Sequence, residues 1–307
     1  LRLARRHGLG IVHARSYVAS VMALAVRRAT GARFLFDMRG FWADERVDGG
    51  LWPRGGRMYR LAKRFERRFL QTADHVVSLT QAGVDEMQRF DYLQARRPPM
   101  TVIPTCADLS RFVPMKGRRD PAAFTLGYVG SAGTWYVFEA TARAFRHLLA
   151  RRPEARLLVV NRSEHALIRA HLAAAGIPDD RVELRSASHD EIPGLMARMD
   201  ATAFFIKPTF SKQASAPTKL AEFLGCGIPC LANAGVGDMA SILRADQVGV
   251  AVDSFDDEAL TAGVDALLAL CADPGTRDRC VASARKRFSL EEGVARYREI
   301  YERLDHA

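Results

Sequence analysis

The sequence has no long hydrophobic run and few cysteines. No stretch of about 18 apolar residues occurs along its 307 residues, so no segment is typical of a membrane-spanning helix. The five cysteines are an odd number, and they form no C-x-x-C pair and no Cys/His spacing suited to zinc. These absences favour a reducing, cytoplasmic compartment, and they predict neither a bound metal nor a cofactor.

A secretory signal is also missing from the start of the chain. The chain opens on Leu1, within LRLARRHGLG, which is typical of the end of a helix. We therefore expect a fragment, or a start that lies further upstream. The length is sufficient for two domains with their own cores.

Positively charged residues outnumber negatively charged ones. A net charge of +10 is compatible with three classes of partner, namely nucleic acid, anionic lipid and phosphorylated substrate. The arginines are scattered as well as clustered, which weakens the nucleic-acid interpretation. An arginine-rich composition is also typical of a GC-rich genome. We expect no nucleic-acid partner.

Short apolar runs alternate with helical patterns along the chain. Residues 10–14 and 33–37 read as buried strands on either side of a helix over 16–30, which predicts a parallel βαβ unit. Further strands are expected at 75–79, 101–104, 124–130, 156–161, 181–186 and 248–252. The pattern predicts an α/β fold of two doubly wound, Rossmann-like domains that face each other across a cleft.

The boundary between these domains is expected in the charged, apolar-poor stretch 114–121, PMKGRRDP. It divides the chain into residues 1–117 and 118–307. A final helix over 290–304 is expected to return to the first domain.

The run from Phe204 to Ala234 predicts a strand, a loop, a helix, a tight turn and a strand. Ser215 is the expected N-cap of the helix. From there Ser215, Lys219 and Glu222 follow at i, i+4 and i+7 and share one stripe, which we expect to face the cleft.

This stripe carries the chemistry of a nucleotide site. Phosphate binds to backbone N–H groups, a positive helix end and a lysine, and a ribose diol binds to a carboxylate. We predict that Lys219 and Lys212 bind a diphosphate, that Glu222 binds the ribose, and that Ser215 and Thr218 line the helix start. The alternative is an ordinary amphipathic helix with an incidental lysine and glutamate on its surface.

The motif S-x-P-T-K-L-x-E-x-L-x-x-G-x-P, from Ser215 to Pro229, resembles the donor-binding segment of glycosyltransferase family 4. The resemblance implies the GT-B fold, a nucleoside-diphosphate sugar as donor, retention of anomeric configuration, and a ribose contact for Glu222. It extends over nearly the whole chain, although the family's opening strand and glycine-bearing loop would precede Leu1. A second glutamate of the usual pattern is replaced by Ala214.

A second candidate region is the turn after the strand at 124–130. Gly130 and Gly133 allow close backbone approach, so we expect this turn, with Ser131, to offer amides to a phosphate. Many ordinary βα turns have such glycines. The family commonly carries an arginine and a lysine here, where this chain has Ser131 and roughly Tyr136. The missing charge is therefore expected from Lys212 and Lys219.

Polar residues also follow the first two strands. His13, Asp37 and Arg39 are expected at carboxyl ends of strands, where doubly wound sheets bind ligands. The surrounding stretches resemble the acceptor-side cleft of some family 4 enzymes. For His13 the alternative is a satisfied structural histidine. The candidate catalytic residues are Lys219, Lys212, His13, Asp37 and Arg39.

Residues 57–70, RMYRLAKRFERRFL, predict a strongly basic amphipathic helix. Such a helix is suited to peripheral contact with an anionic membrane. For a cytoplasmic protein, this would be the inner face of the membrane. The alternative is a packed helix with a solvated outer face.

Together these features predict a metal-independent hexosyltransferase that moves a sugar from a nucleoside-diphosphate sugar to a hydroxyl acceptor in glycan or glycolipid synthesis. The acceptor is expected to be a glycan, a lipid-linked molecule or a small molecule. Two alternatives stay open. One is a nucleotide-sugar epimerase of the same architecture, and the other is a non-catalytic basic protein that binds lipid or nucleic acid.

Overall fold

The computed structural model describes residues 2–115 and 123–306. The chain forms two compact units. Unit 1 comprises the segment up to Thr105, Thr209–Ala216 and the segment from Glu291 onward, and unit 2 comprises Cys106–Pro208 and Pro217–Leu290. The predicted boundary at 117/118, and most of the predicted linker, lie outside the described residues.

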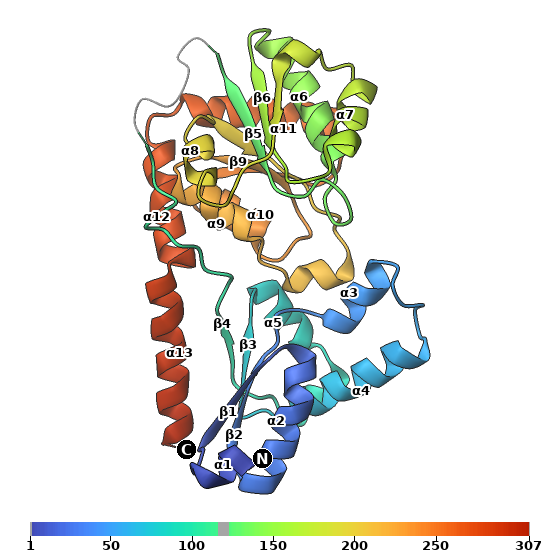
Figure 1. The fold of residues 1–307 in the computed structure, drawn as a ribbon, viewed down its shortest axis with the longest axis vertical. Helices are drawn as coiled ribbons and strands as arrows, with labels where there is room; N and C mark the ends of the chain where they lie inside the picture. The colour runs from blue at the N-terminus through green and yellow to red at the C-terminus, as the bar shows by residue number, and fades with distance from the viewer. Residues whose placement is uncertain (1, 116–122, 307) are drawn as a thin grey trace. The chain divides into compact units, whose positions relative to one another are not determined.

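Unit 1 is built on a four-stranded parallel sheet in the order β1-β2-β3-β4 (Figure 1). Its strands are β1 (Ile11–Arg15), β2 (Arg33–Asp37), β3 (His75–Ser78) and β4 (Met100–Val102). Its helices are α1 (Arg2–Arg6), α2 (Ser16–Thr30), α3 (Trp42–Asp48), α4 (Arg57–Thr72), α5 (Gln81–Gln88), η1 (Asp91–Leu93), η3 (Phe210–Ala214) and α13 (Leu290–Asp305).

Both faces of the unit 1 sheet are buried, because successive side chains of a strand point to opposite faces. Phe34 and Phe36 of β2 pack with Phe69 of α4 on one face. On the other face, Leu35 lies in a cluster with Ile300 and other side chains of α13. This two-sided burial explains why β2 reads as a continuous apolar run.

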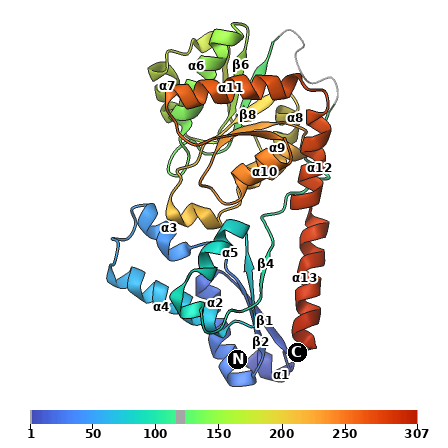
Figure 2. The ribbon, with the colours of Figure 1, turned by 180° about the vertical axis from the view of Figure 1, so that it is seen from behind.

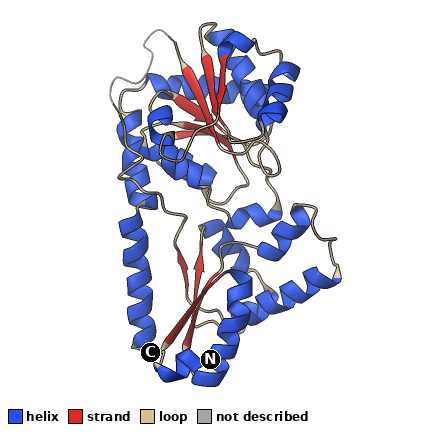
Figure 3. Cartoon of the chain, in the orientation of Figure 1, coloured by secondary structure: helices blue, strands red, loops and turns tan. Residues whose placement is uncertain are grey.

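Unit 2 is built on a six-stranded parallel sheet in the order β10-β9-β8-β5-β6-β7. Strands are drawn in red in Figure 3. Its strands are β5 (Thr125–Val129), β6 (Arg156–Val160), β7 (Val182–Arg185), β8 (Ala201–Ala203), β9 (Cys230–Asn233) and β10 (Gly249–Val252). Its helices are α6 (Phe138–Arg151), α7 (His165–Ala174), η2 (Asp179–Arg181), α8 (Ile192–Met196), α9 (Thr218–Gly225), α10 (Met239–Ala245), α11 (Asp257–Ala272) and α12 (Thr276–Phe288). Two parallel, Rossmann-like sheets confirm the predicted fold class.

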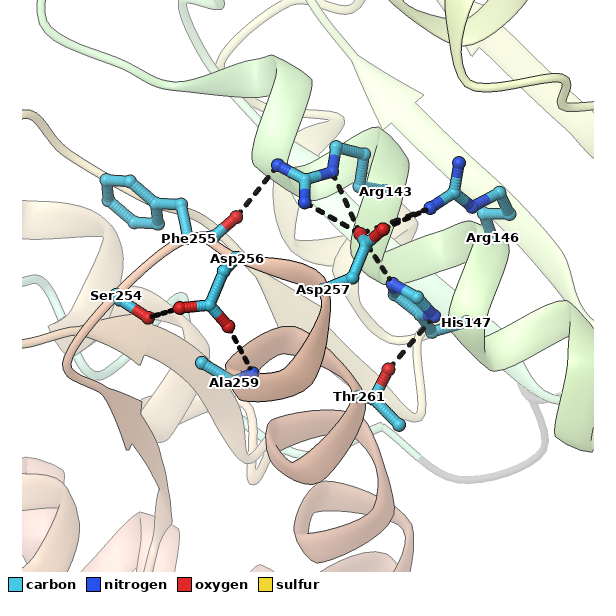
Figure 4. A network of polar contacts seen from close by, with 9 residues as sticks. All are labelled: Arg143, Arg146, His147, Ser254, Phe255, Asp256, Asp257, Ala259 and Thr261. Carbon is cyan, nitrogen blue, oxygen red and sulfur yellow. Dashed lines mark hydrogen bonds and ion pairs between the residues drawn. The ribbon is translucent and has the colours of Figure 1, made fainter.

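Helices α6 and α11 of unit 2 are joined by a surface network around Asp257 (Figure 4). Its carboxylate accepts hydrogen bonds from Arg143 at 2.6 Å and from Arg146 at 3.1 Å, and His147 lies 3.1 Å away. Helix α11 also packs over β9 and β10 (Figure 2). The network therefore fastens two helices that cover the sheet, and its groups lie at the surface.

No helix within the described residues is long and apolar enough to cross a membrane.

Candidate functional site

The candidate site in unit 2 begins where the strand order changes direction. Strand β5 has β6 on one side and β8 on the other, so the connections after β5 and β8 leave the sheet in opposite directions. Ligands of doubly wound sheets bind at such a switch point, outside the carboxyl ends of the strands. The turn after β5 starts at Gly130, and the chain after β8 leads to α9.

The prediction that Ser215 caps the central helix is wrong. Helix α9 begins at Thr218, with Pro217 in the N-cap position and in extended conformation, and Ser215 follows η3 in unit 1 with φ −110° and ψ 130°. A proline disfavours α conformation in the residue before it, so the helix does not extend back through Ala216. Lys219 and Glu222 remain three residues apart on one face of α9.

The amine of Lys219 is buried and donates no hydrogen bond to any described residue. Its Nζ lies 3.6 Å from the ring centre of Tyr136 and 4.9 Å from that of Tyr128. Burial lowers the pKa of Lys219 to about 7, although the nearby charges of Glu222 and Glu164 raise it. The stripe was expected to face the cleft, but aromatic rings cover this amine, and no described residue accepts a hydrogen bond from it.

Gly130 is required by the position of Lys219. A Cβ atom at residue 130 would lie 2.4 Å from Cε of Lys219, and the backbone φ of 110° is one that other residues rarely adopt. The lysine therefore lies directly against the backbone of the turn after β5. The sequence identified this glycine as a site residue, and the structure places it beside Lys219.

Three amides of this turn, those of Gly130, Ala132 and Gly133, are already engaged, which corrects the expectation that Gly130 and Gly133 offer open amides to a phosphate. The N–H groups of Ala132 and Gly133 donate to the two carboxylate oxygens of Glu164 at 2.8 and 2.9 Å. Burial raises the pKa of Glu164, but these amides and the side chain of Asn161 outweigh it, so the pKa lies below its usual value. Ser131 is exposed beside them.

Glu164 is a residue that sequence reasoning missed. It lies at the N-cap position of α7. Asn161 begins the connection from β6 to α7, and its side-chain amide donates a hydrogen bond to the carbonyl of Gly130 at 2.8 Å. An Asn followed by Glu three residues later, between a strand and a helix, is the signal that could have identified this pair.

Glu222 completes the group around Lys219. Burial raises the pKa of Glu222, against the lowering effects of His189 and Lys219. The pKa of Tyr136 is also raised, first by burial and then by the charge of Glu222. Lys219, Glu222 and Tyr136 thus form one electrostatically coupled cluster within unit 2.

Lys212 lies in unit 1 and has a counter-ion there. Its Nζ is 2.8 Å from a carboxylate oxygen of Glu45, and its side chain is 8% exposed. The same segment is anchored by the N–H of Ser211, which donates to Asp48 at 2.9 Å, and by the carbonyl of Gln213, which accepts from Thr80 at 2.7 Å. The structure therefore explains the burial of Lys212 by a protein contact.

The acceptor-side candidates of unit 1 differ in their positions. His13 is the third residue of β1 and not a strand end as expected, and its Nδ1 lies 2.7 Å from the hydroxyl of Tyr301. Asp37 does end β2, accepts a hydrogen bond from Tyr297 at 3.0 Å, and keeps its Oδ1 buried without a partner among the described residues. Arg39 is exposed, with a φ of 60°.

Residues 2–115 and 123–306 contain no cluster of three or more His, Cys, Asp or Glu side chains that could hold a metal ion.

Comparisons with solved structures identify the fold. Sucrose-phosphate synthase from Thermosynechococcus elongatus superposes with a TM-score of 0.76 at 18% identity, over 99% of this chain and 76% of that one. A glycosyltransferase from Rickettsia africae gives 0.74 at 16% identity, over 99% and 79%. HepE from Anabaena, in complex with UDP, gives 0.73 at 17% identity, over 100% and 80%. These similarities show the GT-B fold.

A search of curated proteins found no match to the sequence. Two family models match, however. A glycosyl transferase 4-like domain matches residues 1–106, and glycosyl transferases group 1 matches residues 114–287. Because the second match covers more than half of the 307 residues, the chain belongs to the glycosyl transferases group 1 family.

Proposed function

We propose that this protein transfers a sugar from a nucleoside-diphosphate sugar to a hydroxyl acceptor, with retention of configuration and without a metal ion. Membership of the group 1 family supports glycosyl transfer. Similar structures that contain UDP, such as HepE from Anabaena, support a nucleoside diphosphate as the carrier. The proposed acceptor is a hydroxyl of a glycan, a lipid-linked molecule or a small molecule.

The buried amine of Lys219, which has no hydrogen-bond acceptor among the described residues, is the observation that carries this proposal. A charged amine without an acceptor is costly inside a protein, so its retention is best explained by a ligand that supplies the negative charge. Cleavage of the anomeric C–O bond leaves that charge on the departing diphosphate. The ammonium of Lys219 would stabilise it, because fixed cations act strongly where water is excluded.

The remaining residues of the cluster suit the rest of a nucleotide. Glu222 lies one helical turn from Lys219 and offers carboxylate oxygens to a ribose diol. Thr218 is the first helical residue of α9, so its amide lies at the positive end of the helix. Glu164 holds the turn at Gly130 in the conformation that Lys219 packs against. We assign Glu164 a positioning role for that reason.

The acceptor is proposed to bind near Asp37 and Arg39. Asp37 has a buried carboxylate oxygen without a partner among the described residues, which suits a hydroxyl donor. Arg39 is exposed two residues later. His13 contacts Tyr301 in this structure, and we propose it as a support for Asp37, whose Oδ2 lies 3.8 Å from its Nε2.

The experiment is a donor screen followed by matched substitutions. UDP-, GDP- and ADP-sugars are tested for thermal stabilisation of the full chain, which requires no acceptor. We expect one donor to raise the melting temperature, Lys219→Met to weaken its binding about a hundredfold, and Glu222→Gln to weaken it less. Lys286→Met, an exposed lysine of α12, is the control that keeps wild-type affinity.

Acceptor-dependent release of nucleoside diphosphate then tests transfer. Release without any acceptor would indicate another reaction. Wild-type turnover in both the Lys219→Met and the Glu222→Gln variants would refute the assigned site.

A further inference from the structure

A groove in unit 1 exposes apolar side chains between α2 and α4. These two helices pack side by side (Figures 1 and 2). It has a volume of about 160 Å³. Its lining residues include Val18 and Val21 of α2, and Met58, Leu61 and Phe65 of α4. Val18 is 70% exposed and Met58 55% exposed, so the groove opens to solvent with large aliphatic side chains on both sides.

Arginines run along the α4 side of this groove. At 100° per residue, Arg57, Arg64 and Arg68 lie within about 60° of Leu61 around the helix axis. All three are exposed. The opposite arc of α4 faces the interior of unit 1, where Glu66 is fully buried. The exposed arc therefore carries cations on one side and aliphatic groups on the other.

Neither of the two helices that border this groove carries an exposed acid. Helix α2, which is fully described, contains no Asp or Glu. The single acid of α4, Glu66, is fully buried and forms an ion pair with Lys63 at 2.5 Å. Tyr17, at the base of the groove, donates its hydroxyl to the same carboxylate. The solvent side of both helices is thus positive and apolar.

We propose that this α2–α4 face binds the surface of an anionic lipid bilayer. Aliphatic side chains beside a row of arginines match the layering of a membrane, where anionic headgroups lie over acyl chains. Val21, Met58 and Leu61 enter the acyl boundary, and Arg57, Arg64 and Arg68 contact the headgroups. Nucleic acid fits less well, because single strands require exposed aromatic rings for stacking, and the exposed groove residues are aliphatic.

This surface goes beyond the proposed transfer reaction, and its test needs no donor or acceptor. The full chain is sedimented with vesicles of phosphatidylcholine alone and of phosphatidylcholine with phosphatidylglycerol. We expect binding to the anionic vesicles, weakened by salt, and little binding to the neutral ones. Equal binding to both compositions, or binding to neither, overturns the proposal.

A triple variant and a matched control distinguish binding through this face from a general effect of net charge. Arg57→Gln/Arg64→Gln/Arg68→Gln is expected to weaken binding to anionic vesicles roughly a hundredfold. Arg169→Gln/Arg285→Gln/Lys286→Gln removes the same charge from exposed positions of unit 2 and is expected to bind nearly as well as the wild type. Equal losses in both triple variants would show a net-charge effect and refute a specific surface.

The apolar contact has its own pair of variants. Val21→Ser/Leu61→Ser, at positions 43% and 48% exposed, is expected to weaken binding about tenfold. Leu290→Ser/Val294→Ser, at positions 56% and 51% exposed, is the control that retains binding. Circular dichroism verifies that each variant is folded. An unaffected Val21→Ser/Leu61→Ser variant refutes insertion into the bilayer, as does full competition by single-stranded DNA.

Tryptophan fluorescence locates the contact directly. The chain has three tryptophans, and Trp42 and Trp52 line the groove. In a Trp135→Phe variant, emission comes from these two alone. Lipids with brominated acyl chains are expected to quench them in anionic vesicles, and absence of quenching in vesicle-bound protein contradicts the assigned face.

Discussion

Two half-buried lysines, Lys63 in unit 1 and Lys219 in unit 2, are held in opposite ways. In unit 1, Lys63 Nζ lies 2.9 Å from Asp44 and 2.5 Å from Glu66, and although burial lowers its pKa, these two carboxylates outweigh burial and raise it. In unit 2, Lys219 Nζ has no acceptor among the described residues, and burial lowers its pKa to about 7. Both lysines also contact aromatic rings.

The difference distinguishes a structural charge from a functional one. A buried ammonium with two carboxylates is satisfied by the fold, so removal of either partner leaves a stranded charge. A buried ammonium without an acceptor lowers the stability of the empty protein and is satisfied when an anion binds.

The largest effect is expected from Lys63→Met. The substitution removes the ion-pair partner of Glu66, which is fully buried. We expect it to lower the free energy of unfolding by about 3 kcal/mol. Urea unfolding measures the loss. A second replacement, Glu66→Met, removes the stranded carboxylate and is expected to restore most of the stability. A loss below about 1 kcal/mol in Lys63→Met would place this pair among weak surface ion pairs.

Lys219→Met is expected to act in the opposite direction on the empty protein. The folded pKa of about 7 lies below the unfolded value, so the unfolded chain binds more protons between these two pH values. The unfavourable contribution of Lys219 is therefore complete below about pH 7 and fades toward about pH 10. We expect Lys219→Met to raise the free energy of unfolding by about 2 kcal/mol at pH 6. A destabilised variant at pH 6 contradicts this interpretation.

Donor affinity is expected to depend on pH through the same amine. Binding of a diphosphate favours the ammonium form, and this form becomes scarce in the free protein above about pH 7. From pH 6.5 to 8.5 the affinity for a nucleoside-diphosphate sugar is expected to fall roughly tenfold to thirtyfold. Calorimetry in buffers of different ionisation enthalpy would also detect the proton uptake. In Lys219→Met this pH dependence disappears, and its persistence would assign it to another group.

The smallest effect is expected at Asp257, whose network lies at the surface (Figure 4). A hydrogen bond from Arg143, and to a smaller extent one from His147, lowers the pKa of this carboxyl to about 2. Its stabilising effect is present above the unfolded pKa and is lost as the pH falls through about 2. We expect Asp257→Asn to lower the melting temperature slightly at low salt and not at high salt. A large decrease in melting temperature that does not depend on salt would contradict the expectation that exposed charges contribute less to stability than buried ones.

The elements were predictable where the pattern is local. The predicted helix over 16–30 and strand over 33–37 have the observed bounds of α2 and β2. Ser215 shows where local signals compete, because an N-cap residue two positions before a proline was read as the helix start. Helix α4 was also predicted, but its packing against α2 was not.

The site was predictable in part. Lys219, Glu222 and Gly130 were identified from their motif and their turn, and the structure brings them together within unit 2. Glu164 was missed, because its carboxylate reaches amides that lie 31 and 32 residues earlier in the chain. The same limit applies to Lys212, whose partner Glu45 lies 167 residues away.

The sequence by itself determined the alternation of strands and helices, the parallel sheets and the presence of a lysine and a glutamate on one face of α9, because these follow from spacing along the chain. The tertiary structure alone decided which charges have partners. Pairing depends on contacts between distant segments. Among the residues that the structure describes, it left Lys219 without an acceptor while it gave one to Lys63 and to Lys212.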